Sequence, residues 1–227
     1  SSIAVLSMGS MEVRIDDNSG FCFGVVRAIG EAEEALRATG EVCSLGDIVH
    51  NRVEVQRLEE LGLRTVTHDD MPSLAGRTLL IRAHGEPPAT YARAKELCIN
   101  VIDATCPVVA RLQRRLREAY EHMQRVGGSV VLLGKRGHAE VIGLTGQVDD
   151  DVRVVESVAD LEGVDFSRPI YLLSQTTQSI ELFNSLAAEI RSRVAEGVEV
   201  TIDDAICRRV AGRESLLAEF SKGVDVV

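Results

Sequence analysis

Tryptophan is absent from the 227-residue sequence, and aromatic residues make up only 4% of it. The core must therefore be built mainly from aliphatic side chains, which suits buried parallel strands covered by helices. No apolar run approaches the roughly 20 residues needed to cross a bilayer, so we expect no membrane span. The formal net charge of -10 argues against nucleic-acid binding, because such surfaces normally carry a basic stripe.

Paired cysteine motifs and the features of a secretory signal are also missing. The first residues contain neither a basic region nor a long apolar stretch. The five cysteines are odd in number and widely spaced. We therefore expect a cytoplasmic protein whose cysteines ligate a metal or are buried as thiols, rather than forming structural disulfides.

Short apolar segments alternate with longer helical segments along most of the chain. We expect strands at about 11–15, 42–45, 79–82, 101–104, 130–133, 152–155, 170–173, 198–202 and 224–227. We expect helices at about 22–39 and 51–61, from 87 or 88, from 107 to about 127, and at 179–195 and 208–222. This alternation predicts an α/β fold with parallel sheets, in which ligands bind where strands end and helices begin.

Three of the cysteines lie just before predicted helices: Cys22, Cys106 and Cys207. The positive end of a helix dipole favours the thiolate, which is the metal-binding form of cysteine. Cys43 lies inside a predicted strand and Cys98 near a helix end, so we expect both to be plain buried thiols.

The three candidate ligands come from separate segments, unlike the compact cysteine pairs of zinc ribbons. Three protein thiolates with an open fourth position suit a catalytic iron–sulfur cluster. Zinc with an exogenous fourth ligand is the alternative that spacing alone leaves open.

Polar residues gather at the same strand-to-helix loops. His50, His84 and His138 each lie in such a loop near glycine, and Glu140 follows His138 by two residues. The loop at 174–179 is rich in amides and hydroxyls. Solvated histidines and helix-capping hydroxyls are the simpler interpretation. The alternative is a site in which histidines and helix N-termini attract a diphosphate and Glu140 donates a proton.

Seven sequence blocks, in order, resemble those of the 4-hydroxy-3-methylbut-2-enyl diphosphate reductase (LytB) family. They are GFCFGV (20–25) with RAI (27–29), IVHN (48–51), IRAHG (81–85), VIDATCP (101–107), GKRGHAEV (134–141), QTT (175–177) and ICR (206–208). The resemblance covers the chain from about residue 12 to its end. Each block is weak alone, but seven in order are highly specific.

The resemblance implies three similar α/β units around a pseudo-threefold axis, a trefoil-like arrangement. Each unit gives one cysteine to a central [4Fe–4S] cluster, and Cys22, Cys106 and Cys207 match those positions. The implied divisions are an N-terminal strand region packing with the third unit (11–22), a first unit (23–106), a second (107–206) and the start of a third (207–227). We expect the third to be incomplete, because the sequence stops before the family's Ser-x-Asn substrate segment.

The resemblance also implies an activity: reductive removal of the substrate hydroxyl as water, giving isopentenyl and dimethylallyl diphosphate in the last step of the non-mevalonate isoprenoid pathway. Electrons would come from a ferredoxin or flavodoxin to a monomeric enzyme in the bacterial cytoplasm, or in the plastid of a plant. By motif position the diphosphate-pocket residues are His50, His84 and His138. We expect His138 to be a catalytic residue as well. Glu140 matches the proton-delivering carboxylate, and Thr176, with Gln175 beside it, matches the threonine near the substrate hydroxyl.

Two other readings remain at this point. Quinolinate synthase is also a three-cysteine, three-unit iron–sulfur protein, but its motifs do not match HAE (138–140) or QTT (175–177). A zinc- or cluster-stabilised binding module without turnover is the non-enzymatic alternative. Consumption of the diphosphate substrate would separate the reductase from both.

Overall fold

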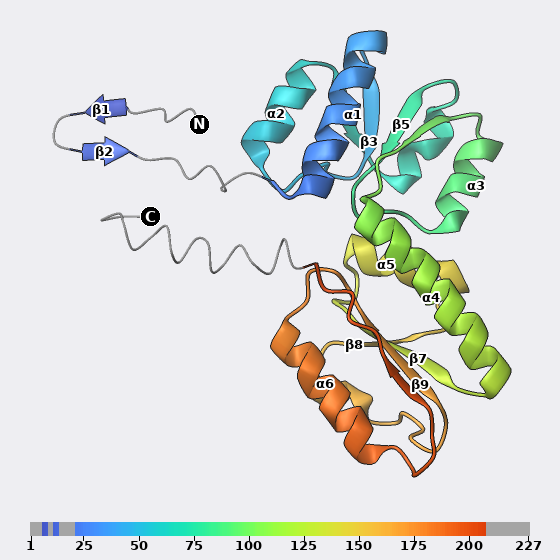
Figure 1. Ribbon diagram of the computed structural model, residues 1–227. Coiled ribbons are helices and arrows are strands. Elements are labelled where there is room, and N and C mark those ends of the chain that lie inside the picture. Colours follow the sequence, from blue (N-terminus) through green and yellow to red (C-terminus); the bar gives the residue numbers. More distant parts are fainter. Residues whose placement is uncertain (1–5, 9–10, 14–20, 208–227) are drawn as a thin grey trace.

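Two four-stranded parallel sheets form the body of the protein, in a computed structural model that describes residues 6–8, 11–13 and 21–207 (Figure 1). The first sheet contains β3 (Val42–Leu45), β4 (Leu63–Val66), β5 (Thr78–Ile81) and β6 (Asn100–Asp103). The second contains β7 (Ser129–Leu133), β8 (Arg153–Val155), β9 (Ile170–Ser174) and β10 (Val200–Ile202). The predicted α/β architecture with parallel sheets is confirmed.

The two sheets repeat one topology. Their spatial orders are β4-β3-β5-β6 and β8-β7-β9-β10, so each unit places its second strand outside its first, followed by its third and fourth. The direction in which successive strands are added to the sheet therefore reverses between β3 and β5 in the first sheet, and between β7 and β9 in the second. Ligands bind at such switch points in open α/β sheets, beyond the carboxyl ends of the strands.

Helices cover both faces of each sheet. They are α1 (Phe23–Thr39), α2 (Arg52–Glu60), α3 (Pro88–Glu96), α4 (Pro107–Val126), α5 (Ala139–Thr145) and α6 (Ile180–Arg193). The 3-10 segments η1 (His68–Ser73), η2 (Gly146–Val148) and η3 (Val158–Leu161) lie in the connections. In the first unit α1 and α2 pack on one face and α3 with η1 on the other. In the second, α4 and α5 pack on one face and α6 with η3 on the other. Burial on both faces explains why the central strands are continuous apolar runs.

Helix α4 shows how the sequence fixes these elements. Pro107 occupies its first position, where the missing N–H costs no hydrogen bond. Gly127 ends it in the left-handed conformation, with a φ of 72°. Its buried side chains recur at helical spacing: Val109, Leu112, Leu116, Ala119 and Met123. The last four pack against the second sheet.

Some elements differ from the sequence expectation. Strand β4 is not among the predicted strands, because only its first and last residues are buried and the polar Arg64 and Thr65 stand between them. Residues 11–15 were expected as one strand; β2 (Met11–Val13) pairs antiparallel with β1 (Leu6–Met8), which was not predicted. The expected helix at 208–222, strand at 224–227 and third unit lie outside the described residues. No helix in the described part is long and apolar enough to cross a membrane.

Candidate functional site

The two switch points bring the predicted polar residues together. His50 follows β3 and His84 follows β5, whereas His138 follows β7 and Thr176 follows β9. Two of these residues thus come from each sheet. The fourth strands, β6 and β10, lead to Cys106 and Cys207.

Three histidine rings form a contiguous cluster. The ring centroids of His50 and His84 are 5.9 Å apart with an interplanar angle of 61°. Those of His84 and His138 are 5.3 Å apart at 68°. His84 therefore lies between a loop of its own sheet and a loop of the other, which no local sequence feature shows.

Two members of the cluster, His84 and His138, favour the neutral form near neutral pH. Burial is the largest cause that lowers the pKa of His84, to about 4, and the charges of Arg82, His138 and His50 lower it further. Burial also lowers the pKa of His138, followed by the charges of His50, Lys135 and Arg82. His84 thus offers one N–H donor to an anion but no positive charge, unlike the positive potential expected from the sequence.

Individual ring nitrogens have defined roles. His138 is the N-cap of α5, and its Nδ1 accepts a hydrogen bond from the Glu140 backbone N–H at 3.1 Å. The neutral ring therefore carries its proton on Nε2, which is left to donate. The buried Nδ1 of His84 has no hydrogen-bond partner among the described residues. Buried polar atoms are normally paired, so this nitrogen indicates a place for a ligand.

Glu140 is a buried carboxylic acid held by Thr176. The side chain is 2% exposed. The Thr176 backbone N–H donates to one carboxylate oxygen at 2.7 Å, and the Thr176 hydroxyl donates to the other at 2.9 Å. Burial raises the pKa of Glu140 above its ordinary value, and the two Thr176 bonds oppose that rise. A carboxyl group with a raised pKa is suited to holding a proton for transfer.

Gln175 is 1% exposed and hydrogen-bonded on both ends of its amide. Its Oε1 accepts from the Lys135 backbone N–H at 3.0 Å and from Gln178 Nε2 at 3.2 Å. Its Nε2 donates to the Thr177 hydroxyl at 3.2 Å. Gln175 thus joins the loop after β7 to the loop after β9. The first of these loops leads to Glu140 in α5, and the second carries Thr176.

All three candidate cysteine ligands line one cavity of about 110 Å³. Cys22 and Cys106 are the N-caps of α1 and α4, as predicted, and neither side chain makes a capping hydrogen bond. The helix expected after Cys207 lies outside the described residues. The lining side chains of the cavity that carry chemistry are Cys22, His84, Cys106, Glu140, Thr176, Thr177 and Cys207.

Backbone contacts tie the cysteines to the polar loops. The Cys106 N–H donates to the Ala83 carbonyl at 3.0 Å, directly before His84. The Cys207 N–H donates to the Thr176 carbonyl at 2.7 Å. The first turn of α1 approaches Cys106 so closely that a Cβ on Gly24 would lie 2.7 Å from its sulfur.

The other two cysteines have different surroundings. Cys43 is buried in β3, as expected, and burial raises its thiol pKa. The expectation of burial was wrong for Cys98, which is exposed. The chain leaves α3 through Cys98 in a left-handed turn, with a φ of 55°, so this residue lies in a surface turn rather than in the helix.

The residues around the cavity fit an iron–sulfur cluster. Within the described part of the chain, no three His, Cys, Asp or Glu side chains are close enough to hold one metal ion. The three thiols instead surround a common space, as ligands to different irons of one cluster would. The absence of a side chain at Gly24 leaves room for the Cys106 sulfur beside that space.

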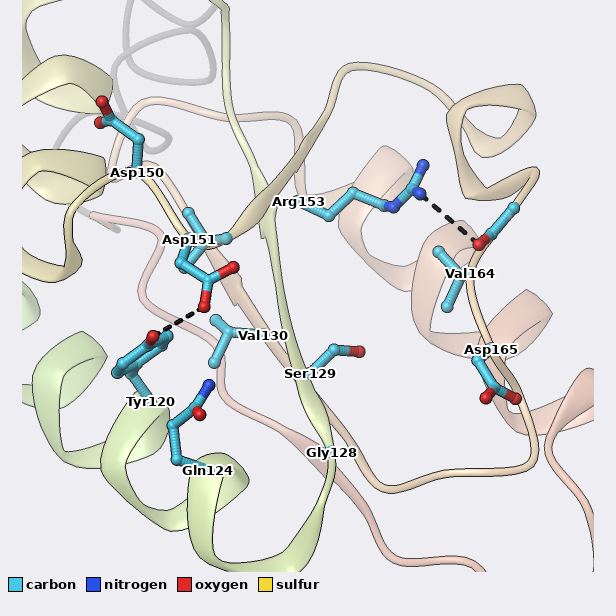
Figure 2. A pocket seen from close by; sticks show the side chains of 12 residues that line it. Tyr120, Gln124, Gly128, Ser129, Val130, Asp150, Asp151, Arg153, Val164 and Asp165 are labelled. Carbon is cyan, nitrogen blue, oxygen red and sulfur yellow. Dashed lines mark hydrogen bonds between the residues drawn. The ribbon is translucent and has the colours of Figure 1, made fainter.

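A larger hollow, of about 470 Å³, lies between the end of α4 and the starts of β7 and β8. Figure 2 shows it, with the Tyr120 hydroxyl donating to Asp151 at 2.6 Å. Its lining contains no cysteine or histidine. It lies at the amino-terminal edge of the second sheet, away from the switch point, so we place the functional site at the smaller cavity.

The sequence matches the family described as LytB protein over residues 13–227. A 4-hydroxy-3-methylbut-2-enyl diphosphate reductase of Parabacteroides distasonis is 50% identical over 217 residues, covering 96% of this chain and 75% of the relative. The enzyme of the same name from Porphyromonas gingivalis is 46% identical over 216 residues, covering 95% and 75%.

Solved structures give the same likeness. A structure of (E)-4-hydroxy-3-methyl-but-2-enyl diphosphate reductase, the terminal enzyme of the non-mevalonate pathway, superposes with a TM-score of 0.78 at 34% identity, covering 92% of this chain and 73% of that one. The Plasmodium falciparum reductase superposes with a TM-score of 0.77 at 26% identity, covering 91% and 64%. This chain thus spans about three quarters of the curated relatives and less than two thirds of the Plasmodium protein.

Proposed function

The chain belongs to the LytB family, and from that premise we propose that it is a 4-hydroxy-3-methylbut-2-enyl diphosphate reductase. The reaction adds two electrons and two protons to the substrate, breaks the bond between carbon and the hydroxyl oxygen, and releases water. Isopentenyl and dimethylallyl diphosphate are the products. The observation that carries the proposal is a single cavity in which three cysteines, a buried acid and a histidine from separate loops meet.

We propose that Cys22, Cys106 and Cys207 hold a [4Fe–4S] cluster in this cavity. When bound, such a cluster supplies electrons and a Lewis-acidic iron without a protein ligand. The all-thiol donor set and its distribution around a common space support this over zinc, which binds all its ligands at about 2.0–2.3 Å from one ion. With the proposed unit boundaries, 23–106 and 107–206, Cys22 lies directly before the first unit and Cys106 is its last residue. Cys207 directly follows the second unit.

Glu140 is the proposed proton donor to the leaving hydroxyl oxygen. Its burial favours the protonated form, and it lines the same cavity as the three cysteines. Thr176 orients the carboxyl group by two hydrogen bonds and, from the same cavity wall, is placed to contact the substrate hydroxyl. Gln175 supports this arrangement by joining the two loops.

The histidine cluster is the proposed diphosphate site. His84 lines the cavity, and its ring contacts His50 on one side and His138 on the other. The substrate would extend from this cluster, where ring N–H groups donate to phosphate oxygens, to the cysteine-lined part beside Glu140. Substrate bound in this partly apolar cavity would displace water from it, which would strengthen each of these interactions.

The electron donor, expected to be of the ferredoxin or flavodoxin type, and the monomeric, cytoplasmic state remain predictions from the family resemblance. The family match argues against quinolinate synthase. A binding module without turnover is the remaining alternative.

Anaerobic turnover tests the proposal. Purified protein would be assayed for iron and acid-labile sulfide, then given the substrate and a chemically reduced viologen as electron donor. About four irons with matching sulfide per chain and formation of both products are expected. A cluster-loaded chain that leaves the substrate unchanged would contradict the reductase assignment and favour the binding module.

A further inference from the structure

Arg82 is a partly buried arginine two residues before His84. Its guanidinium packs on Gly46, where a Cβ would lie 2.6 Å from Arg82 Cζ. Gly46 has a φ of 83°, which also favours glycine at this point. In the part of the chain that the structure describes, its hydrogen bonding is limited to a long contact of 3.4 Å from Nη1 to the Asp47 carbonyl. Most of its five N–H donors are thus left for another partner.

The charge of Arg82 is not neutralised by a direct ion pair. Among the described residues, no carboxylate lies within ion-pair distance of the guanidinium. Asp47 and Glu86 are the acids near enough to interact with it electrostatically. The Glu86 carboxyl lies 2.9 Å from His68 Nε2 instead, and its burial raises its pKa and so disfavours its negative charge. Burial also lowers the pKa of Arg82, but a guanidinium remains charged in proteins.

A partly buried cation that forms no ion pair with any described residue is costly, so the position of Arg82 needs an explanation. Its charge acts on His84 and His138, the second and third rings of the cluster. Lys135 is the other cation that acts on His138, and it lies on the exposed surface. His84 and His138 therefore combine neutral N–H donors with a positive charge that is near enough to act on both rings and that packs against the loop leading to His50. That combination suits a ligand with several negative charges, because charge-assisted interactions are stronger than neutral hydrogen bonds.

We propose that Arg82 supplies the fixed positive charge that attracts and holds the diphosphate group at the histidine cluster. The inference rests on the proposed function. It adds to that function by assigning the positive charge of the diphosphate site to one residue. Sequence reasoning gave Arg82 no role. The available signal was its position two residues before His84, in the turn that follows β5, where the Gly85 N–H donates to the Arg82 carbonyl at 3.0 Å.

Binding of inorganic pyrophosphate, measured by calorimetry on anaerobically purified protein, tests this directly. Arg82→Gln should weaken binding about tenfold or more at low salt, and Arg82→Lys should retain most of the affinity. The salt dependence of binding should also become shallower in Arg82→Gln. In turnover assays KM should rise by a similar factor, with a much smaller change in kcat. Arg125→Gln, at the exposed end of α4, removes the same charge far from the cluster and should change none of these values.

Thermal unfolding of each variant shows whether a loss of affinity comes from the lost charge or from a loosened Gly46 loop, against which Arg82 packs. Unchanged pyrophosphate affinity in a folded Arg82→Gln protein would overturn the inference, as would wild-type protein that binds no pyrophosphate. If Arg82→Gln is unfolded, Arg82→Lys decides: a tenfold or greater loss of affinity in the folded Arg82→Lys protein would overturn the role of charge. Substrate reduction by the wild type with pyrophosphate binding independent of Arg82 would leave the proposed function intact. Arg82-dependent binding without reduction would refute the function alone.

Discussion

Thr176 joins the buried acid Glu140 to the segment that carries Cys207. Its backbone N–H and its hydroxyl donate to the two carboxylate oxygens of Glu140, at 2.7 and 2.9 Å. Its carbonyl accepts from the Cys207 N–H at 2.7 Å. Thr176, in the loop after β9, thus positions both a proposed proton donor and a proposed cluster ligand. Small shifts of this loop would therefore affect both.

The role of Glu140 is tested by Glu140→Gln. The amide keeps the shape of the side chain and can still accept from the Thr176 N–H, but it has no acidic proton. We expect kcat to fall about 100-fold or more, with iron content and pyrophosphate binding retained. Glu121→Gln, on the exposed surface of α4, is the matched control. Near-normal turnover of Glu140→Gln would remove this residue from the proton path.

The contact between Gly24 and Cys106 gives a second prediction. Alanine at position 24 would put its Cβ 2.7 Å from the Cys106 sulfur, so one of the two must move. We expect Gly24→Ala to lower the iron content and to destabilise the protein by about 1–3 kcal/mol. Gly30→Ala lies in the same helix with no atom within 4 Å of the new Cβ.

The Gly30 control should have the opposite effect on stability, a gain of about 0.5–1 kcal/mol, because alanine is the better helix former. Chemical denaturation and iron analysis of both variants check the pair. Equal iron content in Gly24→Ala and wild type would show that the approach of α1 to Cys106 does not matter for the cluster.

The cysteine assignment is tested by serine substitutions. Cys106→Ser should lose the cluster and its visible absorption, because the hydroxyl is a poor substitute for a thiolate ligand. Cys98→Ser, which changes an exposed thiol, should retain the iron of the wild type. Cys43→Ser should retain it too, although a buried hydroxyl will cost some stability. Iron retained equally in all three variants would refute the ligand set.

The lowered pKa of His84 predicts a loss of stability in acid. The unfolded chain binds a proton at His84 near pH 6.5, whereas the folded protein does so only near pH 4. Between these values the unfolded state binds more protons, so this residue makes the free energy of unfolding fall as the pH falls. His84→Gln should reduce that dependence. Denaturation curves at several pH values between about 4.5 and 7 measure the slopes, and an equal slope in His84→Gln and the wild type would contradict the prediction.

Local patterns predicted most helices and strands, because their signals lie within one element. The apolar runs of β7 and β9 and the capping signals of α4, Pro107 and Gly127, are examples. Strand β4 escaped prediction because its edge position leaves two of its four residues exposed. Burial of Cys98 was wrongly expected because the turn after α3 depends on backbone conformation that its sequence position did not show.

The sequence by itself determined the α/β class, the family, and which cysteines, histidines and carboxylate are candidates, because those features depend on residue type and spacing along the chain. Only the tertiary structure decided that His84 touches His138 from the other sheet and that Thr176 holds Glu140. Those contacts join residues tens of positions apart. They arise because two sheets of the same strand order bring the carboxyl ends of their strands to one cavity, and burial there sets the charges.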